Sequence, residues 1–204
     1  MTRAEAKERN RRALLDAAFQ VVARDGYRAR LDEIADRAGL TTGAVYSLFG
    51  SKNGLVVALV ADYLRPYYEE IEQAVPAGLD LLEAVDAFAR YYRRSCDAPD
   101  ALSGLSLQIT LLDMALHDPD LGSRLATSVR AQESHLVTLF TGRSHHGSVV
   151  TSQQAQRLTT ALRALFVGLS QGVPLGLAPG ADEQYFADVA RALASLIDHD
   201  ADGS

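Results

Sequence analysis

Apolar residues recur along this chain at intervals of three and four, which is the spacing of one face of an α-helix. The first such stripe consists of Leu14, Leu15, Ala18, Phe19 and Val22. It predicts a helix over about residues 4–24, and Gly26 is a suitable stop because glycine adopts a positive φ without strain. No segment shows the alternation of period two that a half-buried strand needs, so the pattern predicts an all-α fold.

Helix start and stop signals divide the rest of the chain into further segments, which makes about nine helices in all. These helices are expected at about 32–38, 42–49, 52–75, 79–95, 102–116, 119–141, 153–175 and 182–198. Ser51 and Asp118 are clear starts, because each offers a side-chain oxygen to the free N–H groups of the helix that follows. The polar stretch 142–152 (GRSHHGSVVTS) is expected to be a mobile loop.

Residues 32–52, DEIADRAGLTTGAVYSLFGSK, carry the strongest functional signal. Two short helices joined at Gly39 have the plan of a helix-turn-helix, whose second helix enters the major groove of DNA. The inner face of this second helix is expected to carry Val45, Leu48 and Phe49, which would pack on Phe19, Ile34 and Leu40. The outer arc carries small and polar residues that suit the groove, namely Thr42, Gly43, Ala44, Tyr46 and Ser47. An ordinary helical hairpin is the alternative.

The charges are distributed unevenly along the chain. Residues 1–55 hold 10 Lys and Arg against 7 Asp and Glu, a net charge of +3, whereas residues 56–204 hold 10 against 19, a net charge of −9. A basic head on an acidic body concentrates affinity for DNA at one end. The polar start and the lack of a long apolar run lead us to expect a soluble, cytoplasmic protein, and the single Cys96 excludes an internal disulfide.

Lys52 lies in the first turn of a predicted helix, where the helix dipole disfavours a cation by about 0.3–1 kcal/mol. A lysine is favourable there if an anion also occupies that helix end, because free N–H groups bind phosphate. Thr41, Tyr46 and Lys52 could therefore hold one strand of a DNA backbone. A merely solvated lysine is the alternative.

The pattern from Ile34 through Ala38-Gly39-Leu40-Thr41, Gly43, Val45-Tyr46, Phe49 and Ser51-Lys52 resembles the TetR family of bacterial transcription repressors, closely over about residues 14–59. The resemblance implies a helix-turn-helix DNA-binding domain over 1–51 and a larger helical ligand-binding and dimerisation domain over 52–204. It also implies a homodimer on a palindromic DNA operator. By motif position it implies DNA contacts from Thr41, Thr42, Gly43, Ala44, Tyr46, Ser47 and Lys52.

Two departures from the family pattern affect this region. Arg30 stands where the family usually has Thr or Ser, so the cap of the second helix is lost at a cost of ~0.5–2 kcal/mol. Arg30, with Arg28, could instead reach a DNA phosphate. Asn53-Gly54 stands where the family tends to place acidic residues, so the start of the fourth helix is expected to be loose.

The body offers candidates for a ligand pocket and for a lever. Pro66 lies well inside the fourth helix and is expected to kink it, either to transmit ligand binding or only to improve packing. Polar and aromatic residues on mostly apolar faces suit a small, moderately apolar effector. These candidates are Tyr63, Tyr67, Tyr91, Tyr92, Gln108, Thr110, Asp113, Met114, His135 and Phe166. Gln108 and Asp113 are the most informative if they are buried, because buried polar groups need partners.

The last two predicted helices are amphipathic and could pair with those of a second copy as a four-helix bundle. The apolar residues expected in that interface are Leu162, Leu165, Leu169, Val173, Leu193, Leu196 and Ile197. The alternative is a hairpin that packs only on the core of its own chain.

Other chemistry has little support in the sequence. His117, His135, Asp113 and Glu133 have no spacing that favours a metal site, and the motifs of phosphate-binding loops and hydrolases are absent, so we expect neither a metal nor a cofactor. The sequence therefore predicts a ligand-responsive repressor that a small-molecule effector releases from DNA. An all-helical enzyme and a DNA-binding architectural protein without a ligand are the alternatives.

Overall fold

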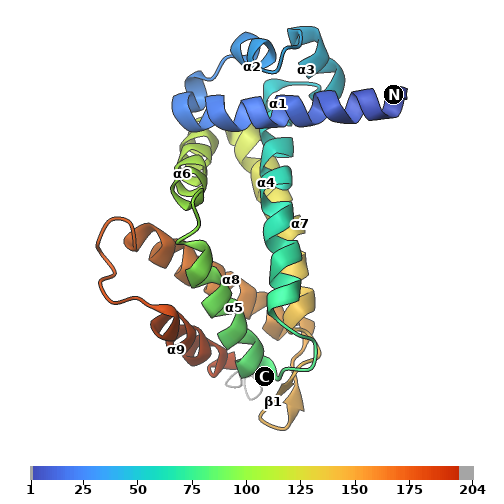
Figure 1. Cartoon of the computed structure of the whole chain (residues 1–204). Helices are drawn as coiled ribbons and strands as arrows, with labels where there is room; N and C mark the ends of the chain where they lie inside the picture. Colours follow the sequence, from blue (N-terminus) through green and yellow to red (C-terminus); the bar gives the residue numbers. More distant parts are fainter. Residues whose placement is uncertain (1, 198–204) are drawn as a thin grey trace. The chain divides into compact units, whose positions relative to one another are not determined.

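The computed structural model describes residues 2–197, except for the side chains of Tyr27, Leu64 and Gln132. Within this range the chain forms nine α-helices, one short 3-10 helix and one small hairpin, so the predicted all-α fold is confirmed (Figure 1). The last helix is expected to run to about residue 198, but it ends four residues earlier, at Ala194, where Ser195 is its C-cap, so this expected boundary is wrong.

The helices begin and end close to where the sequence signals place them. They are α1 (Arg3–Asp25), η1 (Gly26–Arg28), α2 (Leu31–Arg37), α3 (Thr42–Phe49), α4 (Lys52–Ala74), α5 (Leu81–Ser95), α6 (Ala101–His117), α7 (Pro119–Phe140), α8 (Ser152–Gly172) and α9 (Glu183–Ala194). Over residues 2–197 no single helix is long and apolar enough to cross a membrane; the bent pair α3 and α4 meets that criterion only when the two are joined.

Side-chain caps define several of these starts. Asp118 Oδ1 accepts from the N–H of Leu121 at 3.0 Å, and Ser51 Oγ accepts from the N–H of Gly54 at 2.9 Å, as the sequence predicts. Gly26 ends α1 with a φ of 56°, a conformation that favours glycine. The helix boundaries therefore follow from local capping chemistry.

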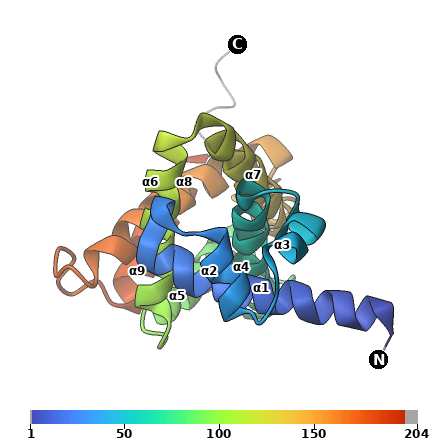
Figure 2. The same cartoon turned by 90° about the horizontal axis from the view of Figure 1, so that it is seen from above.

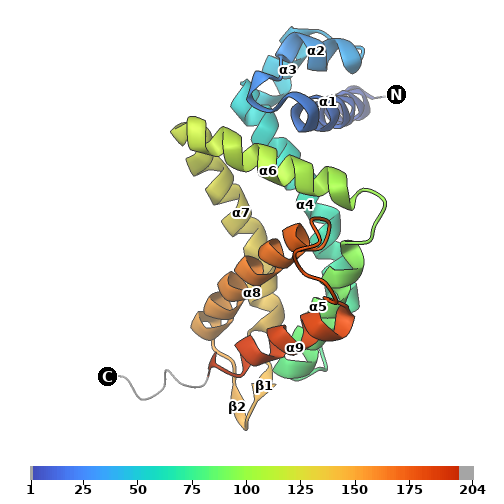
Figure 3. The same cartoon turned by 90° about the vertical axis from the view of Figure 1, so that its left-hand side faces the viewer.

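Two further sequence expectations about the C-terminal part are wrong. The stretch 142–152 contains an antiparallel hairpin of β1 (Ser144–His145) and β2 (Ser148–Val149), and His145 is buried (Figure 3). Helix α8 ends at Gly172, three residues earlier than expected, because the chain folds back there. A Cβ on Gly172 would lie 3.3 Å from that of Ala178.

The chain divides into two compact units, Met1–Pro66 with Ser103–Arg130 and Tyr67–Leu102 with Ala131–Ser204, called unit 1 and unit 2 below. The core of unit 1 combines side chains from α1, α2, α3, the first half of α4, α6 and α7. These units follow packing, and α4 passes from one to the other at Pro66 as one continuous helix. The functional division of the chain after residue 51 stays a prediction.

In unit 2, α5 and α9 pack side by side over an aromatic core. Phe88 and Phe166 have ring centroids 5.4 Å apart, and Phe166 stacks on Phe186 at 5.9 Å. Arg191 on α9 forms an ion pair with Asp86 on α5 at 2.8 Å. Burial of these rings is the main stabilising contribution in unit 2, since exposed ion pairs contribute about 0–1 kcal/mol each.

Arg143, which is only 7% exposed, joins three parts of unit 2. Its Nε donates to the carbonyl of Leu139 at 2.6 Å, and its Nη1 donates to the carbonyls of Pro76 at 3.0 Å and Leu79 at 2.7 Å. Burial lowers the pKa of its guanidinium. One buried side chain thus ties the turn between α4 and α5 to the end of α7.

We expect Arg143→Met to lower the free energy of unfolding by about 2–4 kcal/mol, because the carbonyls of Leu139, Pro76 and Leu79 lose the buried guanidinium that donates to them. Urea unfolding followed by circular dichroism measures this change. Arg65→Met is the matched control, because Arg65 is 57% exposed and its partner Asp62 keeps ion pairs with Arg11 and Arg12, so the change should be no more than about 0.5 kcal/mol. Equal effects of the two variants would contradict the role of Arg143.

Candidate functional site

Helices α2 and α3 form a helix-turn-helix, as predicted, and α1 packs against α2 (Figure 2). Gly39 makes the turn with a φ of 68°, and the N–H of Leu40 donates to the carbonyl of Ala35 at 2.9 Å. Ile34 on α2 and Val45 on α3 are buried in the core of unit 1. The turn and the core together fix how α3 is presented.

Helix α3 has the two faces that the sequence predicts. Val45 is fully buried, and Leu48 and Phe49 pack partly buried against the same core. The residues of the outer arc are exposed or half-buried: Thr42, Gly43, Ala44, Tyr46 and Ser47. Tyr46 is 54% exposed, which is unusual for an aromatic side chain without a partner surface. The outer arc is therefore an exposed surface that a large ligand such as a nucleic acid can contact.

Thr41 precedes this arc and caps α3. Its hydroxyl accepts from the N–H of Ala44 at 3.4 Å, while its carbonyl accepts from the same group at 2.9 Å. The side chain remains exposed at the start of the helix. A threonine in this position can cap α3 and still present its hydroxyl to an anion.

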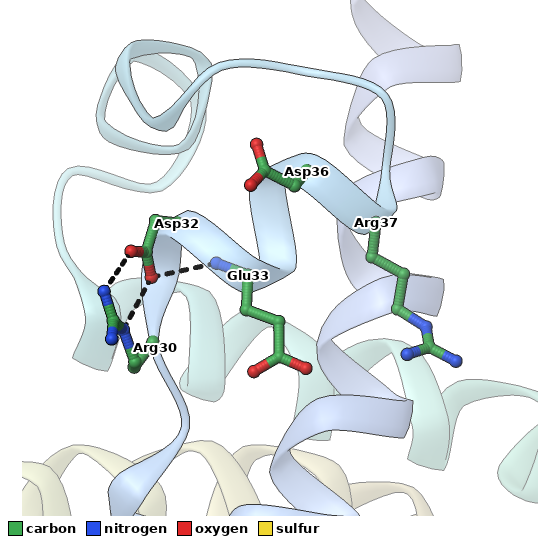
Figure 4. Close-up of a pocket in the computed structure, with 5 residues that line it drawn as sticks. All are labelled: Arg30, Asp32, Glu33, Asp36 and Arg37. Carbon is green, nitrogen blue, oxygen red and sulfur yellow. Dashed lines mark hydrogen bonds and ion pairs between the residues drawn. The ribbon is translucent and has the colours of Figure 1, made fainter.

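The start of α2 shows the loss of its cap. Arg30 occupies the N-cap position without capping through its side chain, within the described part of the chain, and bonds instead to Asp32, with Nε to Oδ1 at 3.0 Å (Figure 4). Asp32 also accepts from the N–H of Glu33 at 2.9 Å, which partly replaces the cap. The ion pair lowers the pKa of Asp32 and raises that of Arg30.

A shallow depression lies along this side of α2 (Figure 4). It is lined by Arg30, Asp32, Glu33, Asp36 and Arg37. Three acids and two bases leave it no strong preference for an anion. Glu33 pairs with Arg24, and Arg37 Nε donates to Gln20 at 2.7 Å, so these side chains also hold α2 on α1.

The start of α4 is tightly held, so the expectation of a loose start is wrong. Asn53 Nδ2 donates to Asp118 Oδ2 at 2.9 Å, which links α4 to the first turn of α7. A Cβ on Gly54 would lie 2.0 Å from the carbonyl oxygen of Phe49, so only glycine fits this approach of α4 to α3. The N–H of Leu121 and the Asn53 amide lower the pKa of Asp118, and burial lowers the pKa of Lys52.

Tyr63 connects α1, α4 and α6 inside unit 1. Its ring stacks on Phe19 with centroids 5.8 Å apart, and its hydroxyl oxygen lies 1.9 Å from the position that a Cβ on Gly104 would take. Thr110 on α6 lies 3.4 Å from the Cβ position of Gly26 at the end of α1. Helix α6 is thus packed against the same elements that present α3.

The predicted ligand-binding residues fall into both units. Tyr63, Gln108, Asp113 and Met114 belong to unit 1, and Tyr67, Tyr91, His135 and Phe166 to unit 2. Gln108 and Asp113 are exposed, so the expectation that they are buried polar groups is wrong; the inward face of α6 carries Leu107 and Met114 instead. Met114 is a core residue. His135 is exposed and lies 3.9 Å from Glu72.

In unit 2, Tyr67 lies in a cluster of aromatic rings. Tyr68, Tyr91 and Tyr92 surround it, with centroids 5.5, 5.7 and 5.9 Å from its own. Its hydroxyl oxygen is buried and has no hydrogen-bond partner among the described residues, and burial raises its pKa well above the ordinary value. A buried hydroxyl without a partner costs about 1–3 kcal/mol, so a bound acceptor would be favourable.

Glu133, which the sequence suggested only as a metal candidate, is a second buried polar group in unit 2. Glu133 on α7 is 6% exposed and lies against Arg163 Nε on α8. Burial and the nearby Glu133 raise the pKa of Tyr68 to about 12. A single glutamate in an amphipathic helix gives no sign of burial, so the sequence held no signal for it.

The predicted dimer residues differ in exposure. Leu162 is fully buried in its own chain, so its assignment to an interface is wrong. Leu165, Leu169, Val173, Leu193 and Ile197 are half-buried. Leu196 is 60% exposed. Between α8 and α9, Leu175 and Leu177 are also exposed, and neither is among the predicted interface residues.

The residues considered for a metal do not converge. Asp113 and His117 neighbour each other in unit 1, with 3.4 Å between Oδ1 and Nδ1, whereas Glu133 and His135 belong to unit 2. Over the described residues no group of three His, Cys, Asp or Glu side chains is placed to hold a metal. Burial raises the pKa of the Cys96 thiol, which disfavours its reactive thiolate form.

Residues 14–59 match the family described as bacterial regulatory proteins, tetR family. The HTH-type transcriptional repressor KstR2 of Rhodococcus jostii (strain RHA1) is 31% identical over 93 residues, which are 45% of this chain and 46% of that repressor. The chain thus matches less than half the length of this relative.

Two solved structures share the fold of nearly the whole chain. One is described as a TetR-family transcriptional regulator from Rhodococcus sp., with a TM-score of 0.68, 20% identity, and coverage of 93% of this chain and 98% of that one. The other is the multidrug binding protein EbrR complexed with imidazole, with a TM-score of 0.66, 22% identity, and coverage of 90% and 93%. At these identities the similarity is one of fold.

We expect Gly54→Ala to destabilise the protein by about 1–3 kcal/mol, because the added methyl group meets the backbone oxygen of Phe49. Gly43→Ala is the matched control: its nearest neighbour, Thr41 Oγ1, would lie 3.6 Å away, and alanine favours a helix by up to about 1 kcal/mol over glycine. Thermal unfolding of both variants tests the pair. A stable Gly54→Ala protein would show that α3 and α4 are free to separate.

Proposed function

This chain belongs to the TetR family of bacterial regulatory proteins, and on that premise we propose that it is a transcriptional repressor released from DNA by a small molecule. It would bind a palindromic operator in the cytoplasm as a homodimer, with no enzymatic step. The observation that carries the proposal is the pair of faces on α3, buried at Val45 and open at Tyr46, inside the matched segment 14–59.

In this proposal α3 enters the major groove of the operator. Gly43 and Ala44 let the helix backbone approach the bases, and the methyl groups of Thr42 and Ala44 contact thymine methyls. Tyr46 and Ser47 are longer or more polar and serve phosphate or base-edge contacts. Thr41 and Lys52 lie at the starts of α3 and α4, where N–H groups favour phosphate.

A second copy is needed because one eight-residue helix reads only one half-site. We propose that α8 and α9 form the dimer, through the half-buried residues Leu165, Leu169, Val173, Leu193 and Ile197 with the exposed Leu196. A two-fold dimer presents its two reading helices about one DNA turn apart, ~34–36 Å. The operator is then a palindrome whose half-sites keep that spacing.

The effector is proposed to bind in unit 2, among the rings around Tyr67. Rings of Tyr91, Tyr92 and Phe166 supply apolar contact, and the hydroxyl of Tyr67 supplies one hydrogen bond to a ligand acceptor. The similarity of fold to EbrR, which is described as a multidrug binding protein, supports a small-molecule role. Residues 52–204 would then form the responsive body and residues 1–51 the reading head.

Helix α4 is the proposed lever, since it runs through Pro66 from one unit into the other. A proline inside a helix removes a backbone hydrogen bond and leaves that turn easier to bend. The effector must bind the DNA-free state more tightly, typically by ~1–3 kcal/mol, to act as a switch. Pro66→Ala tests the lever, because unchanged release by the effector would exclude it.

Selection of bound sequences from random double-stranded DNA tests the function as a whole. The proposal expects enrichment of a palindrome, and loss of that enrichment in Tyr46→Ala, whose exposed side chain lies outside the core. Circular dichroism must show the variant to be folded. Failure of the folded wild-type protein to enrich any sequence would contradict a specific regulator, and enrichment without symmetry would contradict the homodimer.

Phosphate contacts predict a specific change in salt dependence. Lys52→Gln and Arg30→Ala should each lower the slope of log affinity against log salt by about 0.9 per contact, or ~1.8 for a homodimer with two. Arg30 would exchange its exposed pair with Asp32 for a phosphate, and such a pair contributes only about 0–1 kcal/mol. Asp32→Asn should then raise affinity. An unchanged slope in Arg30→Ala would exclude its phosphate role.

Tyr67→Phe tests the proposed effector site separately from the DNA-binding segment. Without effector, removal of a buried hydroxyl that lacks a partner should leave the protein as stable or up to about 1–3 kcal/mol more stable. With an effector found by thermal-shift screening, half-release from DNA should need about tenfold more ligand. Tyr185→Phe, a change at a 47% exposed tyrosine, is the control. Equal effector response in both variants would place the effector elsewhere.

A further inference from the structure

Helix α6 is apolar on two opposite faces. Its inward face carries Leu107 and Met114, each 1% exposed, in the core of unit 1. The opposite face carries five large apolar residues, which we call the outer stripe: Leu102, Leu105, Ile109, Leu112 and Leu116. Leu102 is 67% exposed, Ile109 52%, Leu112 60% and Leu116 74%, whereas Leu105 is half-buried.

The outer stripe has the spacing of a helix-pairing seam. Its members follow one another at steps of three, four, three and four residues, the repeat by which one helix packs along another. At about 100° per residue, Ile109 and Leu116 lie almost opposite Leu107. A helix with two opposite apolar faces is normally covered on both, and among the described residues 2–197 only the inward face of α6 is covered.

The scarcity of charge on α6 indicates which kind of partner would pack on the outer stripe. Residues 101–112 contain no charged side chain, and α6 as a whole has only Asp113 and the weakly basic His117. Residues 56–204 as a whole have a net charge of −9, so two copies repel each other over most of their bodies. The outer stripe is a place where two copies can meet without that repulsion, and charge depletion is typical of an interface core.

The stripe is also symmetric about its middle. Leu102 and Leu116 each lie seven residues from Ile109. When two such helices pair in antiparallel orientation about Ile109, Leu102 of one copy therefore lies opposite Leu116 of the other. A two-fold interface requires such a surface, because the same patch is used by both copies. The 17-residue helix is roughly 25 Å long. Two such faces bury less than about 1,200 Å², the range of weak, concentration-dependent interfaces.

We propose that a second copy of this chain packs on the outer stripe of α6, in a two-fold pairing centred on Ile109. This contact is separate from the α8–α9 surface proposed above, and it can form in the absence of DNA. It would join dimers, and it gains strength when copies are held close together, as on neighbouring DNA sites.

Disulfide cross-linking of the full chain tests the geometry. In a Cys96→Ser background, Ile109→Cys should form a covalent pair of chains on mild oxidation, because the two-fold axis brings the two copies of residue 109 within disulfide range. Val149→Cys is the control, since Val149 is also exposed, at 64%, but lies on the hairpin. The proposal is overturned if Ile109→Cys links no faster than Val149→Cys.

Sedimentation of the full chain over a range of concentrations tests the energetics. Ile109→Glu should raise the dissociation constant of the α6 contact about tenfold or more, because it buries a charge in an apolar interface. Val149→Glu should leave it unchanged. Leu112→Gln is a milder second variant in case Ile109→Glu fails to fold, which thermal unfolding detects. Unchanged association in both folded α6 variants would overturn the pairing and would leave the DNA-binding proposal untouched.

Discussion

The presentation of α3 depends on the burial of Val45. An eight-residue helix is too short to be stable by itself in water, so its packing must hold it. Val45 lies in a core that includes Ile34 on α2 and also Leu107 and Met114 on α6, far away in the sequence. Gly54 adds a backbone constraint, because it lets the start of α4 approach the end of α3. The outer arc is therefore aimed by α4 and α6 as well as by the helix-turn-helix.

The sequence predicted the elements that depend on local chemistry. Helix α3 begins and ends where its residues indicate, and the caps at Ser51 and Asp118 form as expected, because a cap needs only neighbours three residues away. It failed where the outcome depends on distant partners. The polar residues around Arg143 suggested a mobile loop. The Arg143 side chain is nevertheless buried, because it donates to the carbonyls of Pro76 and Leu79, which are distant in the sequence. The expected burial of Gln108 and Asp113 failed for the same reason, because the periodicity of α6 does not show which of its faces is covered.

Unit 2 combines an aromatic core with a buried hydroxyl group to which the core offers no hydrogen-bond partner. Phe166 contacts both Phe88 and Phe186, and all three side chains are buried. Tyr67 contacts Tyr92, which stacks on Phe166, and its buried hydroxyl has no partner among residues 2–197. A phenylalanine there would pack as well and avoid the cost of desolvation, so packing alone does not explain the tyrosine. A ligand that accepts its hydrogen bond does explain it, and then the same atom contributes to affinity and to specificity.

The two faces of helix α6 have different roles. Its inner face completes the core that holds α3, through Leu107 and through the contact of Gly104 with Tyr63. Its outer stripe is suited to a second copy. Any partner on the outer stripe would restrict the rotation of α6, and rotation would shift Gly104 against Tyr63, which in turn stacks on Phe19. Association and DNA binding would therefore be linked if α6 took a different position on DNA and the partner bound one of the two positions more tightly, because only a differential affinity shifts an equilibrium.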